Sequence, residues 1–187
     1  MSARKSVHRM ILSSYFELRI SWVIWVRMSN SESSSIFRRR APVPRADSAL
    51  ARATEEIGDR WSLLILREAF FGVMRHDDIR EDLGIPRSVL TDRLTRLVAR
   101  GLLEKRPYRE LGDRQRFGYS LTEKGRDLAL TFIALTHWSE AHVLGEPGPI
   151  EIVDQESGRS LRVALIDEDG RVVSAERAVP KLRVRDR

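Results

Sequence analysis

The 187-residue chain contains no cysteine, which excludes a disulfide framework, a thiolate metal site, a cysteine nucleophile and a thiol redox switch. Hydrophobic residues make up 42% of it, enough for the core of one ordinary domain with appendages or, at most, two small units. The formal net charge of +6 indicates a polyanionic partner, and the expected compartment is a reducing cytoplasm.

The positive charge is unevenly distributed along the chain. Residues 1–45 carry a net charge of +7, so residues 46–187 together are close to neutral, at −1. Within that part, residues 46–84 carry −4 and residues 85–116 carry +5. Because affinity for a polyanion comes from charges close to its phosphates, this local positive zone indicates phosphate binding more specifically than the total charge does.

Residues 1–45 differ in composition from the rest and are predicted to be a disordered leader. The apolar stretch MILSSYFELRISWVIWVRM at 10–28 is interrupted by three charged residues, so it lacks the ~20 uncharged residues of a membrane span, and it fits a signal peptide poorly. No membrane partner is expected. We interpret Met28 as the natural start and the upstream stretch as an over-extended reading frame; the alternative is a membrane-surface or regulatory arm.

Three short helices are predicted after the leader. Asp47 or Ser48 caps the first, at 48–57. Asp59 caps the second, RWSLLILREAFF, whose broad apolar stripe marks it as central and mostly buried. The segment HDDIREDLG forms the third, with Gly84 in the stop position.

The segment PRSVLTDRLTRLVAR, residues 86–100, is predicted to be an amphipathic helix with Pro86 in its first turn. A projection at 3.6 residues per turn places apolar residues on one face and short polar residues opposite. A helix of this diameter fits the major groove of DNA, where its outer face reaches base edges. The residues predicted to contact bases and phosphates are Arg87, Ser88, Thr91, Thr95 and Arg96, with Arg93 at the margin. The alternative is a solvated amphipathic helix without a partner.

After Gly101 the chain is predicted to form a β-hairpin wing, with strands LLEKRPY and RQRFGYSLT joined by the turn-forming RELGDR. Asp92 of the preceding helix is expected to orient an arginine, to accept from a cytosine amino group or, more simply, to be buried against this wing. Arginines of a wing bond phosphate or enter the minor groove, and those predicted to do so are Arg106, Arg109, Arg114 and Arg116. Solvated surface arginines are the alternative.

A long helix at 123–143, capped by Thr122, follows the wing, and its apolar stripe is wide enough for both a core and a partner. Short β-rich runs then alternate with turn signals, so residues 145–187 are predicted to be a small β-meander with a frayed C-terminus. The predicted fold class is therefore mainly α with small β (α+β). It comprises a winged helix-turn-helix domain at 46–144 and the C-terminal β-meander extension.

Three segments carry a family resemblance: EIGDRWSLLILREAFFGVMR, LTDRLTRLVARGLLEKRPY and YSLTEKGRDL. They are similar to parts of the HxlR-type winged helix-turn-helix transcription regulators of bacteria, over roughly residues 46–144, with Gly-Asp-Arg-Trp and Leu-Thr-Glu-Lys-Gly the most specific elements. The resemblance implies DNA binding and a homodimer held by helices 48–57 and 123–143. Many members carry a cysteine near the start of the first helix and several sense oxidants or electrophiles through it, but Ser48 stands there in this chain.

No catalytic, metal or cofactor site is predicted. The four histidines, His8, His76, His137 and His142, are scattered, and a spacing of five does not place the last two on one helix face as a metal pair requires. Asp-Glu-Asp-Gly at 167–170 lies in a predicted turn without EF-hand spacing. The sequence contains no phosphate-cradling glycine loop, no His-Glu-x-x-His and no Gly-x-Ser-x-Gly motif.

These patterns together predict a sequence-specific transcriptional regulator, a repressor in preference to an activator, that binds double-stranded DNA as a homodimer on a near-palindromic operator. One alternative is a winged-helix protein-interaction module without specific DNA binding. Another is an enzyme built on the β-rich extension, although no nucleophile and base can be named for it. A small-molecule effector could bind between the long helix and the central helix. The sequence does not identify one, since apolar stripes form a core far more often than a ligand site.

Overall fold

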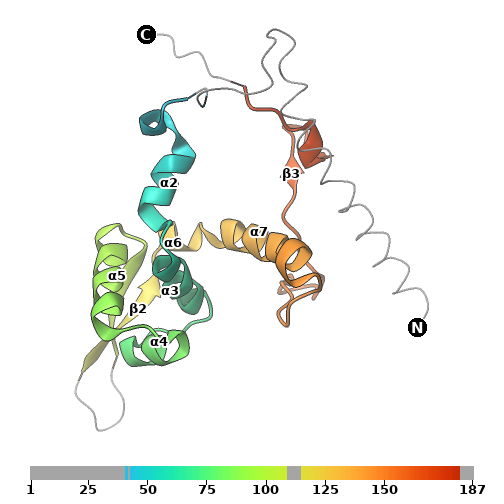
Figure 1. Cartoon of the computed structure of the whole chain (residues 1–187). Coiled ribbons are helices and arrows are strands. Elements are labelled where there is room, and N and C mark those ends of the chain that lie inside the picture. Colours follow the sequence, from blue (N-terminus) through green and yellow to red (C-terminus); the bar gives the residue numbers. More distant parts are fainter. Residues whose placement is uncertain (1–40, 42, 109–114, 182–187) are drawn as a thin grey trace. The chain divides into compact units, whose positions relative to one another are not determined.

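The structure, a computed structural model, describes residues 41, 43–108 and 115–181. The chain divides into two units: one covers Ala41–Phe132, and the other includes everything from Ile133 onward (Figure 1). Nearly all of the leader predicted at 1–45, with the proposed start at Met28, lies outside the described residues.

The three helices predicted before residue 85 are confirmed, together with the residues that cap them. The Ser48 Oγ accepts from the Ala51 amide at 3.3 Å, and the Asp59 Oδ1 accepts from the Ser62 amide at 3.1 Å. Gly84 ends the third helix with a φ of 58°, a left-handed conformation that favours glycine. After a 3-10 turn at Arg45–Asp47, these helices are α2 (Ala49–Ile57), α3 (Arg60–Phe70) and α4 (His76–Leu83).

The amphipathic helix predicted at 86–100 is α5, Arg87–Ala99. Pro86 is the residue that precedes the helix, one position before the first-turn place predicted for it. The leucines of the inner face, Leu90, Leu94 and Leu97, are fully buried. Packing therefore fixes the inner face of α5 and leaves the opposite face open to a partner.

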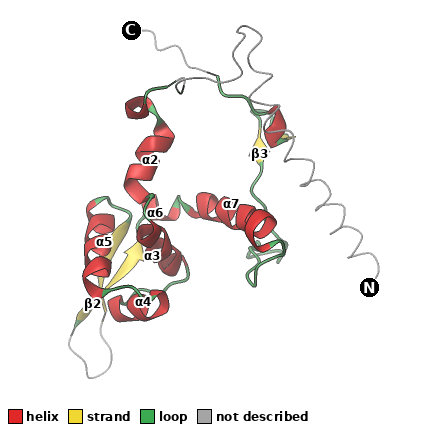
Figure 2. Ribbon diagram, in the orientation of Figure 1, coloured by secondary structure: helices red, strands yellow, loops and turns green. Residues whose placement is uncertain are grey.

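The predicted wing is an antiparallel hairpin of β1 (Leu103–Tyr108) and β2 (Arg116–Leu121), with Leu103 opposite Leu121 (Figure 2). The Tyr119 amide donates to the Met74 carbonyl at 2.8 Å, so the connection between α3 and α4 lies beside β2. Gly118 permits this approach, because an added Cβ would lie only 3.2 Å from the same carbonyl oxygen. The hairpin is therefore held by the helices at its base.

The core of the first unit lies between α3, α4, α5 and the base of the hairpin. The rings of Phe70 and Phe132, the latter from the start of α7 (Ala129–Ser139), pack at its edge with centroids 5.1 Å apart. These two rings are partly buried. Full burial of a large apolar side chain contributes about 1.5–3 kcal/mol to folding, so the fully buried members of the core stabilise the unit strongly. The buried apolar members of the core are Ile65, Leu66, Ile79, Ile85, Leu90, Leu94, Leu97, Leu102, Leu103 and Leu121.

The helix predicted at 123–143 is not continuous. The structure divides it into α6 (Glu123–Arg126), α7 and a π-helical turn, η2 (Glu140–Leu144). Thr122 caps α6 as predicted, since its Oγ1 accepts from the Gly125 amide at 3.1 Å. The Leu128 amide then bonds to the Gly125 carbonyl, three residues back, at 3.2 Å, and this tighter turn interrupts the helix.

The β-meander predicted for 145–187 is small in the structure. In its described residues a ladder pairs β3 (Leu165–Ile166) with β4 (Val172–Val173), and an isolated bridge joins Val153 to Ser160. The expected turns are present, with Gly158 and Gly170 at φ of 65° and 77°. Apolar side chains of these runs remain about half exposed, and a two-stranded ladder without a core stays short. The fold class is mainly α with small β, as predicted.

Candidate nucleic-acid interface

The outer face of α5 is polar and exposed. It brings together five of the residues predicted to contact DNA: Arg87, Ser88, Thr91, Thr95 and Arg96. Because the leucines of the inner face hold α5 in the core, this face can enter a groove without any unpacking of the helix.

Two threonines on this face are hydrogen-bonded to their own helix. The Thr91 hydroxyl donates to the Arg87 carbonyl at 2.9 Å, and the Thr95 hydroxyl donates to the Thr91 carbonyl at 2.8 Å. Each hydroxyl proton is therefore used within α5, while the oxygen lone pairs remain available as acceptors. His76 of α4, for which the sequence indicated no role, lies with its Nε2 3.3 Å from the Thr91 Oγ1.

Arg93, the residue predicted at the margin, is anchored inside the unit. Its side chain is only 23% exposed, and its Nε donates to the Asp59 Oδ1 at 2.9 Å. The same Asp59 caps α3, so this contact ties the start of α3 to the middle of α5. Sequence reasoning identified Asp59 as a cap and missed its second role, because nothing local connects residues 34 positions apart.

Asp92 contacts two arginines, and orienting an arginine was one of the roles expected for it. Its carboxylate accepts from the Arg93 Nη1 at 2.5 Å and from the Arg96 Nε at 3.2 Å. The simpler expectation, burial against the wing, was wrong, since the Asp92 side chain is 47% exposed. Asp92 and Arg96 lie four residues apart and so are neighbours on the helix surface, whereas the adjacent Arg93 reaches Asp92 through its terminal nitrogen.

The environment of Asp59 makes stability depend on pH. Partial burial raises the pKa of this carboxyl, but hydrogen bonds from the Ser62 hydroxyl and amide and from Arg93 outweigh burial and hold the pKa below its ordinary value. A depressed pKa in the folded state gives stability that is present above the unfolded pKa. This contribution is lost as the pH falls through the folded pKa.

We expect Asp59→Ala to lower the free energy of unfolding by about 1–2 kcal/mol at neutral pH, because α3 loses its cap and Arg93 its partner. Urea unfolding between pH 7 and pH 3 should also show that, below about pH 4, the free energy of unfolding falls less steeply with decreasing pH in the variant. Asp82→Ala, which removes an exposed carboxylate of α4, is the control. If Asp82→Ala reduced the pH dependence of stability below about pH 4 as strongly, the effect could not be assigned to Asp59.

Of the four wing arginines predicted to contact DNA, Arg109 and Arg114 lie outside the described residues. Arg106 and Arg116 are exposed on the half of the hairpin nearer the connection between its strands. Arg106 donates to the Glu104 Oε1 through Nε at 2.9 Å and Nη2 at 2.6 Å, and these bonds lower the pKa of Glu104. A phosphate would therefore compete with Glu104 for this guanidinium.

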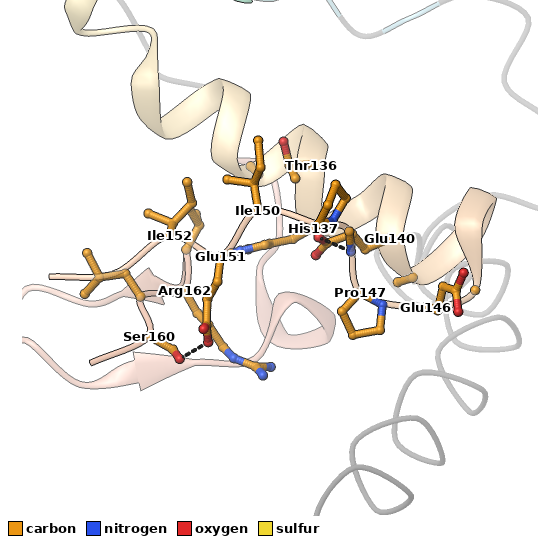
Figure 3. A pocket seen from close by; sticks show the side chains of 17 residues that line it. Thr136, His137, Glu140, Glu146, Pro147, Ile150, Glu151, Ile152, Ser160 and Arg162 are labelled. Carbon is orange, nitrogen blue, oxygen red and sulfur yellow. Dashed lines mark hydrogen bonds between the residues drawn. The ribbon is translucent and has the colours of Figure 1, made fainter. Parts of the chain in front are cut away.

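The second unit contains an open cavity of about 750 Å³ (Figure 3). Two carboxylates of its lining are already hydrogen-bonded: Glu140 accepts from the Gly148 amide at 2.8 Å, and Glu151 accepts from the Ser160 hydroxyl. His137 also lines it. The lining is therefore partly polar, and these two carboxylates are engaged within the unit.

The residues that the structure describes contain neither a metal-ligand cluster nor a membrane span. Within these ranges, no three or more His, Asp or Glu side chains gather closely enough to hold a metal ion. None of the helices described is both long and apolar enough to cross a bilayer.

Comparisons with known proteins agree with this architecture. The HxlR-like helix-turn-helix family matches residues 56–146, which contain α3 to α7 and the wing. An uncharacterised HTH-type transcriptional regulator of Mycobacterium tuberculosis (strain CDC 1551 / Oshkosh) is 46% identical over 101 residues, which are 54% of this chain and 63% of the relative. The chain thus spans less than two thirds of that relative. Another, from Methanothermobacter thermautotrophicus, is 32% identical over 48% of this chain and 68% of the relative.

Two solved structures of candidate transcription factors are also similar. PA1607 superposes with a TM-score of 0.63 and 32% identity, over 73% of this chain and 95% of that structure. PA1374 from Pseudomonas aeruginosa superposes with a TM-score of 0.50 and 34% identity, over 73% of this chain and 92% of that structure. The extent of these matches and the winged helix-turn-helix order of elements lead to one conclusion. The chain belongs to the HxlR-like helix-turn-helix family.

Proposed function

We propose that the chain is a sequence-specific transcription regulator that binds double-stranded DNA as a homodimer in the cytoplasm. The observation that carries this proposal is the outer face of α5, which is exposed and polar while its inner face is locked into the core. In the proposed complex α5 enters the major groove, and the wing, with Arg106 and Arg116, contacts the adjacent backbone or minor groove. The names of the similar proteins, all transcription regulators or candidate transcription factors, support the same reading.

The homodimer is supported by the composition of α7. This helix, ALTFIALTHWS, carries apolar side chains around most of its circumference, and none of its residues is buried. Leu130, Leu135 and Trp138 are 67%, 49% and 58% exposed. A helix that is apolar on all sides is stable in water only when something covers it, and we propose that a second copy does so, with α2 contributing Leu50. Two-fold symmetry would then set half-sites ~34 Å apart or a multiple of that spacing.

Selection of duplexes from a random library by the full chain, at near-physiological salt and again at higher salt, tests this function. An enriched inverted repeat would support a dimeric sequence reader. Recovery of random DNA with affinity that falls steeply with salt would leave a non-specific binder. No recovery at all would favour the protein-interaction module. We propose repression through occupancy of such an operator, and the direction of change of a promoter–reporter fusion would decide this.

Arg96 is the residue of the α5 face that we expect to matter most for discrimination. Arg96→Ala should weaken binding to the selected operator by about 1–3 kcal/mol and leave binding to a scrambled duplex nearly unchanged. Fluorescence titrations of both duplexes measure this, with Arg159→Ala, an exposed arginine of the second unit, as the matched control. Equal losses on both duplexes would instead assign Arg96 to a phosphate.

A further inference from the structure

Four charged side chains form a continuous series of contacts from the start of α3 to the outer face of α5. Asp59 accepts from the Arg93 Nε at 2.9 Å, and the Arg93 Nη1 donates to the Asp92 Oδ2 at 2.5 Å. Asp92 in turn accepts from the Arg96 Nε at 3.2 Å. We name this series, Asp59–Arg93–Asp92–Arg96, the ion-pair chain.

From Arg93 onward, exposure increases along the ion-pair chain toward the surface that would meet DNA, whereas Asp59 at the other end is 40% exposed. The Arg93 side chain is 23% exposed, Asp92 is 47% exposed and Arg96 is 57% exposed. The Arg93 side chain is thus held in place at both ends, because it contacts Asp59, the cap of α3, on one side and Asp92 on the other. Arg96 is bound to the protein through Nε alone, and no described residue bonds to either of its terminal nitrogens.

A carboxylate at position 92 is explained neither by the stability of the fold nor by affinity for DNA. An exposed ion pair of this kind contributes little to folding, since solvent screens it. On a face that approaches phosphates, a negative charge opposes binding of every duplex. What the carboxylate does supply is geometry, because it holds the Arg96 Nε and leaves the outer edge of the guanidinium available to a base.

We propose that Asp92 is a positioning residue that determines specificity, and that the group it positions, Arg96, reads a guanine. The inference rests on the proposed function. Both terminal nitrogens of an arginine held in this way can donate to the O6 and N7 of one guanine, which is the arrangement that discriminates best in the major groove. The contacts of Arg93 with Asp59 and Asp92 also hold the Asp92 carboxylate in place. The orientation of the Arg96 guanidinium therefore does not depend on the flexible side chains of Asp92 and Arg96 alone.

The test compares Asp92→Ala with the unchanged full chain on the selected operator and on a scrambled duplex. Removal of the carboxylate should raise affinity for the scrambled duplex by about twofold to fivefold, while the ratio of operator to scrambled affinity falls about tenfold. Because these changes run in opposite directions, loss of folding cannot produce them. Asp92→Glu, which keeps a carboxylate, should keep most of the ratio. Asp82→Ala removes an equal charge from α4 and should leave the ratio unchanged.

A double variant completes the experiment. If Asp92 acts only through Arg96, the ratio for Asp92→Ala combined with Arg96→Ala equals that of Arg96→Ala alone. A further fall in the double variant would show that Asp92 contacts a base itself and would overturn the positioning role, as would an unchanged ratio in Asp92→Ala. Failure of the unchanged chain to select any sequence would overturn the proposed function, and this inference with it.

Discussion

Replacement of Gly125 by alanine is expected to lower the free energy of unfolding by about 3 kcal/mol or more, a large loss for the addition of a single methyl group. A Cβ at this position would lie 2.2 Å from the Leu102 carbonyl oxygen and 3.1 Å from a methyl group of Leu121. The Leu102 oxygen is backbone and already accepts from the Thr122 amide at 3.1 Å, so it cannot move away without breaking the contact of α6 with β1.

Urea unfolding followed by circular dichroism measures the effect of Gly125→Ala. Gly101→Ala is the matched control, since Gly101 has a φ of 68° but nothing within 4 Å of an added Cβ. It should cost only the 1–2 kcal/mol, roughly, of a left-handed alanine. Equal losses for the two variants would show that α6 shifts freely and that the approach to Leu102 does not restrain it.

The second large effect is expected for Leu94→Ala, at about 2–5 kcal/mol. Leu94 is completely buried on the inner face of α5, in the cluster that also includes Ile65 and Leu66 of α3. Truncation removes apolar contacts and leaves a cavity that rigid helices on either side only partly close. Because the outer face of the same helix is the proposed DNA surface, affinity for the operator should fall together with stability.

Thermal and urea unfolding of Leu94→Ala and of Thr95→Ala show whether the loss of stability comes from lost core packing or from any truncation in this part of α5. Thr95 is exposed one residue further along α5, so its truncation should change the free energy of unfolding by less than about 0.5 kcal/mol. A loss below about 1 kcal/mol for Leu94→Ala would mean that the α5 core can collapse into the vacated space.

Helix boundaries were predictable from the sequence because capping is local chemistry. Ser48, Asp59 and Thr122 each accept from an amide three residues ahead, so the pattern that identifies a cap contains both partners. The apolar face of α5 was predictable for the same reason, since a period of 3.6 residues is set by the helix itself. Family resemblance extended these local predictions to the order of the winged helix-turn-helix.

Features that depend on distant partners were not predictable. The Asp59–Arg93 contact joins residues of two different helices, and neither helix shows its neighbour in its own pattern. The break after α6 lies where the Leu128 amide bonds three residues back to Gly125, next to the close approach of Gly125 to Leu102, and a continuous apolar stripe gives no sign of it. In the extension, alternating apolar residues predicted strands without a surface to pack on. Its described residues form the short β3–β4 ladder and the isolated Val153–Ser160 bridge.

The uneven burial along the chain also sets how its amides exchange with solvent. All the buried apolar residues in the described ranges belong to α3, α4, α5, the hairpin and the short connections between them, whereas α2 and α7 bury none. Deuterium should therefore reach the amides around Leu66 and Leu94 only through global unfolding, and those of α7 through local opening. Covering of α7 by a second copy would slow that opening. Protection of α7 should then increase with protein concentration, while that of the core stays comparatively unchanged.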